Sequence, residues 1–180
     1  MKKYLLLILC SLFISVSLGA QSKSNQHLKF MGIPINGSIT NFQNKLIAKG
    51  FKYDQAGSMA LETPTRIFKG QFAGETAQLF VYYDRDQKFV YRVKVIIDRS
   101  ESEQVISLMK KYKYQMEEKY GATASVSTHN GEICYNIYLD NGEIDLFYYK
   151  LPYDFDHSLL IDYWDDTNTQ KHEANNMNDL

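Results

Sequence analysis

Two series of strand-like segments, each following one predicted helix, constrain the fold of this chain most. The first series comprises residues 66–72, 76–83 and 89–98, and the second comprises residues 122–128, 132–139, 143–149 and 158–164. No helical pattern separates the strands within either series. Because consecutive strands without helical crossovers pair antiparallel, the sequence predicts an α+β fold with an antiparallel sheet rather than a doubly wound parallel one.

The segment 89–98 carries the clearest period of two. Arg92 and Lys94 would point to one face of this strand. The other face would carry Phe89, Tyr91, Val93, Val95 and Ile97. Residues 84–87 (DRDQ) predict a hairpin before this strand, and the Asn-Gly pairs at 130–131 and 141–142 predict type I′ hairpins in the second series.

The first predicted helix begins after Ser38, with Asn36 as a competing N-cap. Gly50 lies where a left-handed residue commonly ends a helix, and Phe51 could fold back to close that end. The apolar stripe consists of Ile39, Phe42 and Leu46.

The second predicted helix begins at a capping box formed by Ser100 and Glu103, and it ends before Gly121. Its stripe consists of Val105, Met109, Tyr112, Met116 and Tyr120. We therefore expect an antiparallel sheet with two helices packed on one face. The order of elements also suggests a doubled helix-plus-strands unit.

The first 20 residues have the order of a secretory signal peptide. Lys2 and Lys3 precede an apolar run that ends in small residues at Gly19 and Ala20. The run is short for a membrane span. We expect cleavage between Ala20 and Gln21, with cleavage after Gly19 as the alternative. The sequence thus predicts a periplasmic or secreted protein without a membrane span after signal cleavage.

The remaining chain reads as one domain with polar ends. Residues 21–27 predict a flexible leader, residues 28–166 a single α+β domain, and residues 167–180 a disordered tail, because neither end offers a periodic apolar pattern. Residues 52–64 read as irregular.

The charge and cysteine content exclude several classes of partner. Removal of the signal peptide lowers the number of Lys and Arg residues from 20 to 18 against 21 Asp and Glu, a net charge of −3. That balance argues against nucleic acid, whose phosphates need clustered cations, and against an anionic membrane surface. Only Cys134 remains after cleavage, so no intramolecular disulfide forms.

The sequence contains no recognisable catalytic, cofactor or metal motif. It lacks the nucleophile elbow, the zinc-protease helix, the P-loop and the dinucleotide fingerprint. Cys134 lies in mid-strand and reads as an inert thiol. The densest polar cluster contains Asp154, Asp156, His157 and Asp162, which could serve a carboxylate-based hydrolase or bind a hard cation. The alternative is that these are solvated loop carboxylates. We expect no cofactor.

The outward face of the sheet is unusually aromatic. Its expected residues are Phe80, Tyr82, Val90, Ile96, Tyr138, Phe147, Tyr149 and Trp164, interleaved with Arg92, Lys94, Asn136, Asp145 and Asp162. Interfaces are enriched in Tyr, Trp and Arg. The candidate binding face comprises Tyr82, Arg92, Tyr138, Phe147, Tyr149 and Trp164.

These residues favour a non-catalytic binding protein for an unknown protein or glycan in the cell envelope or exterior. Three other uses stay open. Aromatic residues also stabilise sheets without any ligand. Residues 52–64 could cover the face, and the chain could associate with itself as a structural component of the envelope.

The stretch 28–51 resembles the opening of uncharacterised secreted proteins from Bacteroides-like gut bacteria. The resemblance rests on residues 29–30 (KF), 32–37 (GIPING), 49–51 (KGF), 68–74 (FKGQFAG), 118–121 (EKYG) and 161–165 (IDYWD). It implies export and no particular activity. The doubled layout also resembles secreted β-lactamase-inhibitor proteins and small outer-membrane assembly lipoproteins, a likeness of fold that implies no function.

Overall fold

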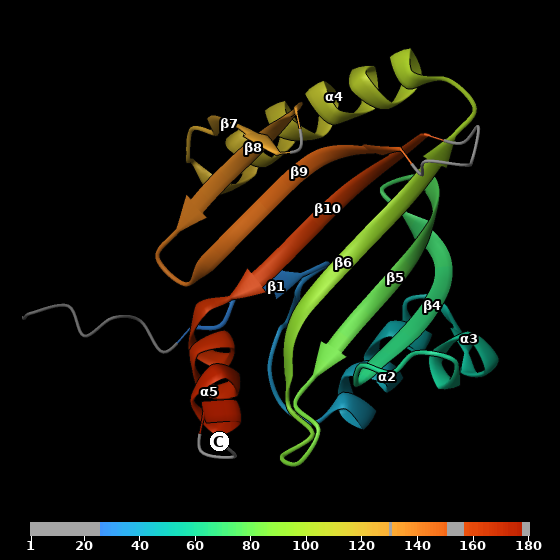
Figure 1. The fold of residues 1–180 in the computed structure, drawn as a ribbon, viewed down its shortest axis with the longest axis vertical. Helices are drawn as coiled ribbons and strands as arrows, with labels where there is room; N and C mark the ends of the chain where they lie inside the picture. Colours follow the sequence, from blue (N-terminus) through green and yellow to red (C-terminus); the bar gives the residue numbers. More distant parts are fainter. Residues whose placement is uncertain (1–25, 130, 151–156, 178–180) are drawn as a thin grey trace, which may run out of the picture.

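The computed structural model describes residues 26–129, 131–150 and 157–177. The main sheet contains β3 (Lys52–Asp54), β4 (Thr65–Phe72), β5 (Glu75–Tyr83), β6 (Val90–Arg99), β7 (Ser125–His129), β8 (Glu132–Leu139), β9 (Gly142–Lys150) and β10 (His157–Asp165). These eight strands pair antiparallel in the order β3-β4-β5-β6-β10-β9-β8-β7 (Figure 1). The predicted α+β fold with an antiparallel sheet is confirmed. The predictions for the signal peptide and for cleavage between Ala20 and Gln21 lie outside the described residues.

The chain runs twice through a helix followed by four strands of the sheet. Helix α2 (Ile39–Ala48) precedes β3 to β6, and helix α4 (Ser102–Tyr120) precedes β7 to β10. The last strand of each set, β6 or β10, lies at the centre, where the two strands pair with each other. This arrangement has the doubled helix-plus-strands order that the sequence suggests.

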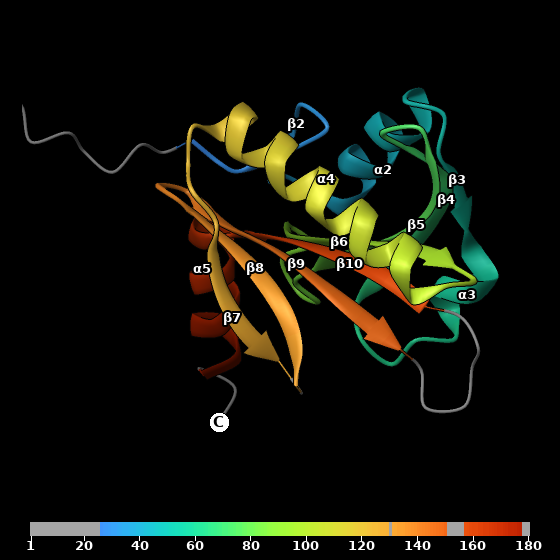
Figure 2. The ribbon, with the colours of Figure 1, turned by 90° about the horizontal axis from the view of Figure 1, so that it is seen from above.

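The helices lie on both sides of the sheet. Figure 2 shows α2 and α4 on one side and α5 (Asp166–Met177) on the other. The core fills the space under α2 and α4, and its fully buried side chains include Phe42, Leu46, Leu79, Val93, Val95, Val105, Ile144, Leu146 and Ile161. Burying each such side chain contributes about 1.5–3 kcal/mol relative to leaving it exposed. No helix in the described part of the chain is long and apolar enough to cross a membrane.

The opening segment closes one side of this core. It forms a small separate hairpin of β1 (Lys29–Phe30) and β2 (Ile33–Pro34). Its apolar side chains are buried: Leu28, Phe30, Ile33 and Ile35. The hairpin packs on the core without joining the main sheet.

Both predicted ends of α2 are confirmed. The Ser38 hydroxyl accepts a hydrogen bond from the backbone N–H of Asn41 at 3.3 Å. At the other end Gly50 has φ of 93°, a left-handed conformation that glycine adopts without steric cost. The N–H groups of Gly50 and Phe51 then donate to the carbonyls of Ile47 (2.9 Å) and Leu46 (3.1 Å), which is the Schellman closure.

The predicted start of α4 is wrong by one residue. Glu101, not Ser100, is the N-cap, and no side-chain hydrogen bond caps this end. A capping box requires its two members to be three residues apart, counted from the true N-cap. From Glu101 that spacing reaches Gln104 rather than Glu103, and the Gln104 amide lies 3.4 Å from the Glu101 carboxylate.

Residues 52–64 are more ordered than their sequence indicates, since they contain β3 and helix α3 (Gln55–Met59). Asp54 caps α3 by accepting from the N–H of Gly57 at 2.9 Å. The Ser58 hydroxyl donates to the Asp54 carbonyl at 2.6 Å and accepts from the N–H of Ile67 in β4 at 2.8 Å. Short polar contacts, rather than an apolar period, hold this segment at the edge of the sheet.

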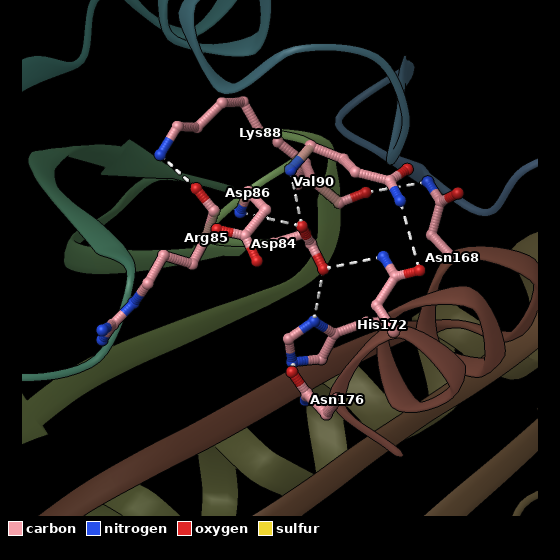
Figure 3. A network of polar contacts seen from close by, with 10 residues as sticks. Asp84, Arg85, Asp86, Lys88, Val90, Asn168, His172 and Asn176 are labelled. Atoms are coloured by element: carbon pink, nitrogen blue, oxygen red, sulfur yellow. Dashed lines mark hydrogen bonds and ion pairs between the residues drawn. The ribbon is translucent and has the colours of Figure 1, made fainter. Parts of the chain in front are cut away.

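The predicted disordered tail is also wrong, because most of it forms α5 (Figure 3). Asp165 caps the helix by accepting from the N–H of Asn168 at 2.9 Å, and it also accepts from the N–H of Leu28 at 2.7 Å. The buried Asn168 amide donates to the carbonyls of Ile35 at 3.0 Å and Val90 at 2.8 Å. Polar side chains hold this helix against the sheet and the opening hairpin, so the lack of apolar residues did not indicate disorder.

The β8–β9 hairpin differs from its prediction by one residue. Leu139 pairs with Gly142, so the two loop residues are Asp140 and Asn141 rather than Asn141 and Gly142. Gly142 instead belongs to β9, where a Cβ would lie 2.1 Å from the carbonyl oxygen of Trp164. Close approach of β10, not turn geometry, requires glycine there. Residue 130 of the other predicted Asn-Gly turn lies outside the described residues.

Candidate functional site

The sheet face opposite α2 and α4 contains a hollow of about 610 Å³. Its lining side chains alternate along each strand with those of the core. On β5, for example, Phe80 and Tyr82 line the hollow, whereas Leu79 and Val81 are buried beneath the helices. We call this site the sheet hollow. No residue of 52–64 is among the described residues that line it, so that segment does not cover it.

The strand register arranges the outward side chains in rows that cross the sheet. One row contains Tyr138, Glu143, Trp164, Arg92 and Tyr82. The next contains Asn136, Asp145, Asp162, Lys94 and Phe80. The third contains Cys134, Phe147, Leu160 and Ile96. Directly opposite side chains on one face lie about 5 Å apart, so each row is a continuous contact surface.

Arg92 is fixed at the centre of the first row. Its guanidinium carbon lies 3.6 Å from the ring centroid of Trp164 and 4.8 Å from that of Tyr82. Its Nε donates to Asp162 Oδ1 at 2.8 Å, and Nη2 forms an ion pair with Oδ2 of the same carboxylate. Two aromatic rings and a buried carboxylate therefore hold this cation in one orientation.

Charge is distributed unequally across the hollow. Lys94 shares the Asp162 carboxylate with Arg92, at 3.6 Å from Oδ2, so β6 presents two cations to one buried anion. Burial and the neighbouring Arg92 lower the pKa of Lys94, although the attraction of Asp162 opposes them. The β6 side of the hollow is therefore positive.

The β9 side carries the opposite charge. Burial, followed by the charge of Asp145 and a hydrogen bond with it, raises the pKa of Glu143 to about 7. Burial also raises the pKa of Asp145, although the Asn136 amide donates to that carboxylate at 2.6 Å. The two carboxylates lie on the same face of one strand, and within the described residues neither forms an ion pair. The hollow is thus bounded by cations on β6 and carboxylates on β9.

A β-bulge at the start of β6 changes the facing of two predicted residues. Tyr82 pairs with Arg92 and Tyr83 with Val90, which leaves Tyr91 without a cross-strand partner. Val90, predicted on the outward face, is fully buried in the core. Tyr91, predicted on the core face, instead stacks on His172 of α5 with ring centroids 4.2 Å apart. The alternation of 89–98 holds only from Arg92 onward.

The other predicted face residues lie on the expected side of the sheet. Five of the six in the candidate binding face line the hollow: Tyr82, Arg92, Phe147, Tyr149 and Trp164. The sixth, Tyr138, is 63% exposed on the same face of β8, outside the hollow lining. Five further residues lie on this face or its rim and were not predicted there: Ser127, Thr128, Cys134, Glu143 and Leu160. Period-two counting could have found Cys134, Glu143 and Leu160.

The structure does not assemble the predicted hydrolase cluster. Asp162 points into the hollow and is bound by Arg92, whereas His157 lies on the other face of β10 and bonds the hydroxyl of Tyr148. Asp154 and Asp156 lie outside the described residues. Within 26–129, 131–150 and 157–177 no three His, Cys, Asp or Glu side chains are grouped to hold a metal ion.

The remaining nucleophile on this face is poorly activated. Burial raises the pKa of the Cys134 thiol, and the nearby Asp145 charge adds to the effect. The Asn136 amide lies 3.5 Å from its sulfur. A thiol that stays protonated is a weak nucleophile, so the hollow is better suited to contacts than to covalent chemistry.

A second polar assembly, which we call the α5 junction, borders this face. It comprises Asp84, Val90, Asn168, His172 and Asn175 (Figure 3). His172 Nδ1 lies 3.0 Å from Asp84 Oδ2, and the Asn175 amide donates to the same oxygen at 3.2 Å. The backbone N–H groups of Asp86 and Gln87 bond the other oxygen. Although burial raises the pKa of Asp84, these hydrogen bonds bring it down to about 2.

No family model, curated protein or solved structure matches this chain.

Proposed function

We propose that this chain is a non-catalytic binding protein whose sheet hollow receives a segment of a partner protein. The observation that carries the proposal is the central arrangement of Arg92 between the rings of Trp164 and Tyr82. The few residues that dominate the binding free energy of protein interfaces are enriched in tryptophan, tyrosine and arginine, and they cluster near the centre. A hollow of about 610 Å³ has the volume of a site for a few side chains.

Preorganisation supports the same proposal. The hollow is formed by paired strands rather than by loops, and its central cation is already hydrogen-bonded and stacked. Ordering a flexible long side chain on binding costs about 0.5–1.5 kcal/mol. Arg92 is already ordered, so a partner would not meet that cost at this position.

We also propose that binding occurs in the periplasm or outside the cell. The support is the predicted signal peptide, with its basic start, apolar run and small-residue exit at Ala20. The partner would then be an envelope or extracellular protein, and a glycan is the alternative that the experiment below distinguishes.

The test compares two triple variants of the full mature chain. Tyr138→Ala, Tyr149→Ala, Trp164→Ala removes aromatic area from the outward face. Ile47→Ala, Ile106→Ala, Tyr114→Ala removes exposed apolar area from α2 and α4 instead. Each protein is immobilised and incubated with native envelope and culture-medium fractions, and the captured material is identified by mass spectrometry.

We expect the wild type and the helix-face variant to retain the same partner protein and the sheet-face variant to lose it. Equal capture by all three would contradict the proposal, and capture of carbohydrate alone would replace the protein partner with a glycan. Light scattering during size-exclusion chromatography separates self-association from these outcomes. A dimer that depends on the three outward aromatics would identify the partner as a second copy of the chain.

A further inference from the structure

A second cavity, of about 340 Å³, lies at the far edge of the β3–β6 half and shares no lining residue with the sheet hollow. Three cationic side chains line it: Arg66 of β4, and Arg85 and Lys88 of the turn between β5 and β6. The single carboxylate among its lining residues belongs to Glu62. The cavity therefore carries an excess of two positive charges.

Each of these cations is bonded to a neutral acceptor. Arg66 Nη1 donates to the Gln43 side-chain oxygen at 2.6 Å, and Arg85 Nη2 donates to the Glu62 backbone carbonyl at 3.1 Å. Lys88 Nζ donates to the Arg85 carbonyl. In the part of the chain that the structure describes, none of the three forms an ion pair. Their charges are oriented but not neutralised.

Aromatic and hydroxyl groups hold the cations around one space. The guanidinium of Arg66 and the ammonium of Lys88 each lie 6.0 Å from the ring centroid of Tyr83. Arg66 is also 5.7 Å from the ring of Tyr53. The hydroxyls of Thr63 and Thr65, 3.1 Å apart, add hydrogen-bonding groups to the same lining.

The β5–β6 turn directs Asp84 to one side and the two cations, Arg85 and Lys88, to the other. Asp84 faces the α5 junction and is hydrogen-bonded there, whereas the side chains of Arg85 and Lys88 extend away from α5 (Figure 3). Lys88 has φ of 61°, an unfavourable conformation for a residue with a Cβ. Such conformations persist where surrounding structure imposes them and are concentrated at functional sites.

From this arrangement we infer that the cavity binds a small oxyanion, the phosphate or sulfate group of a monoester or of the free inorganic ion. Guanidinium groups match the paired oxygens of such anions, an ammonium adds a point charge, and threonine hydroxyls donate to the remaining oxygen. A dianionic phosphate monoester or inorganic sulfate neutralises the whole excess charge, and a monoanionic sulfate monoester neutralises half of it. The inference concerns a separate site and does not depend on the proposed function of the sheet hollow.

The experiment is a calorimetric and NMR titration of the full mature chain at neutral pH and low salt. The probes are inorganic phosphate, inorganic sulfate, glucose 6-phosphate, glucose 6-sulfate and, as the uncharged control, glucose. The test variant is Arg85→Gln, Lys88→Gln. The matched control is Lys49→Gln, Lys110→Gln, which removes the same charge from two exposed helix positions.

We expect saturable binding of the anions but not of glucose, with amide shifts at Thr63, Thr65, Arg66 and residues 85–88. Losing two charge-assisted contacts should raise the dissociation constant about tenfold or more in the test variant, against less than about twofold in the control. Tighter binding of the glucose esters than of the inorganic ions would identify a monoester as the ligand, and equal binding would identify the free ion.

A second variant separates binding from folding. Lys88→Gly removes one cation and also relieves the left-handed backbone, so we expect a higher melting temperature together with weaker anion binding. Absence of saturable binding in the wild type, an equal loss in the control variant, or unchanged affinity in both Lys88 variants would each overturn the inference.

Discussion

The sheet hollow and the α5 junction lie next to each other but are held together by different means. The hollow is a product of strand register: side chains two residues apart face the same way, and antiparallel pairing brings them into rows. The α5 junction depends on a few buried polar groups that are far apart in the chain, among them Asp84 and Asn168. The first kind of structure tolerates changes of individual surface side chains, whereas the second depends on each hydrogen bond.

The largest expected effect breaks the strand register itself. In Gly142→Ala the new Cβ would lie 2.1 Å from the carbonyl oxygen of Trp164, so β9 and β10 must move apart. Overpacking against backbone cannot be relieved by a side-chain rotation, and we expect the free energy of unfolding to fall by about 3 kcal/mol or more. Chemical denaturation measures it.

Gly74→Ala is the matched control for this prediction. Gly74 has φ of 89°, but a Cβ there would meet nothing within 4 Å. It should therefore show only the cost of a left-handed backbone, about 1–2 kcal/mol. If both variants lose equal stability, close packing of β10 on Gly142 does not fix the register.

This difference between the two regions also explains what the sequence could predict. Alternation in 76–83 and 143–149 correctly placed Phe80, Tyr82, Phe147 and Tyr149 on one face, because a regular strand repeats every two residues. Val90 was misplaced because a β-bulge has no comparable local pattern. The predicted facing of a side chain is wrong where a bulge or turn shifts the strand pairing by one residue.

The α5 junction could not be predicted from local patterns. Asn168 bonds carbonyls that lie 133 and 78 residues earlier in the chain, at Ile35 and Val90. Those acceptors become available only after the sheet and the opening hairpin have formed. The cavity lined by Arg66, Arg85 and Lys88 has the same origin, since it combines β4 with a turn that is sequentially separate.

The contribution of the α5 junction to the free energy of unfolding should be lost at acid pH. The pKa of Asp84 falls from 3.8 to about 2 on folding, so the unfolded chain binds the proton more strongly. Its stabilising contribution is complete above pH 4 and is lost as pH falls towards 2. That shift corresponds to about 2 kcal/mol, because Asp84 is only 2% exposed and is little screened by water.

Denaturation curves between about pH 6 and pH 2 measure this contribution, and hydrogen exchange locates it. We expect amides of α5 to lose protection before those of β9 and β10. Asp84→Asn should be less stable at neutral pH and should lack this part of the acid dependence, whereas the exposed Asp86→Asn should keep it. Uniform loss of protection across the sheet and α5 would argue against a separately weakened junction.

The smallest expected effect has the opposite sign and belongs to the sheet hollow. The folded protein holds the proton of Glu143 more strongly than the unfolded chain, since burial and Asp145 raise its pKa from 4.5 to about 7. The stabilising contribution of Glu143 is therefore greatest below pH 4.5 and is lost as pH rises through 7.

The variant Glu143→Gln keeps the shape of the side chain without its charge. We expect it to be more stable than the wild type at pH 8 by about 1 kcal/mol, after allowance for screening by water, and equally stable at pH 4. Glu118→Gln, the same change at an exposed position of α4, is the control and should show no such gain, because Glu118 does not contribute to the raised pKa of Glu143. A Glu143→Gln variant that is no more stable at pH 8 than at pH 4, relative to the wild type, would show that the β9 carboxylates already have a compensating cation. The hollow would then lack the charge asymmetry that distinguishes it from the hydrogen-bonded junction beside it.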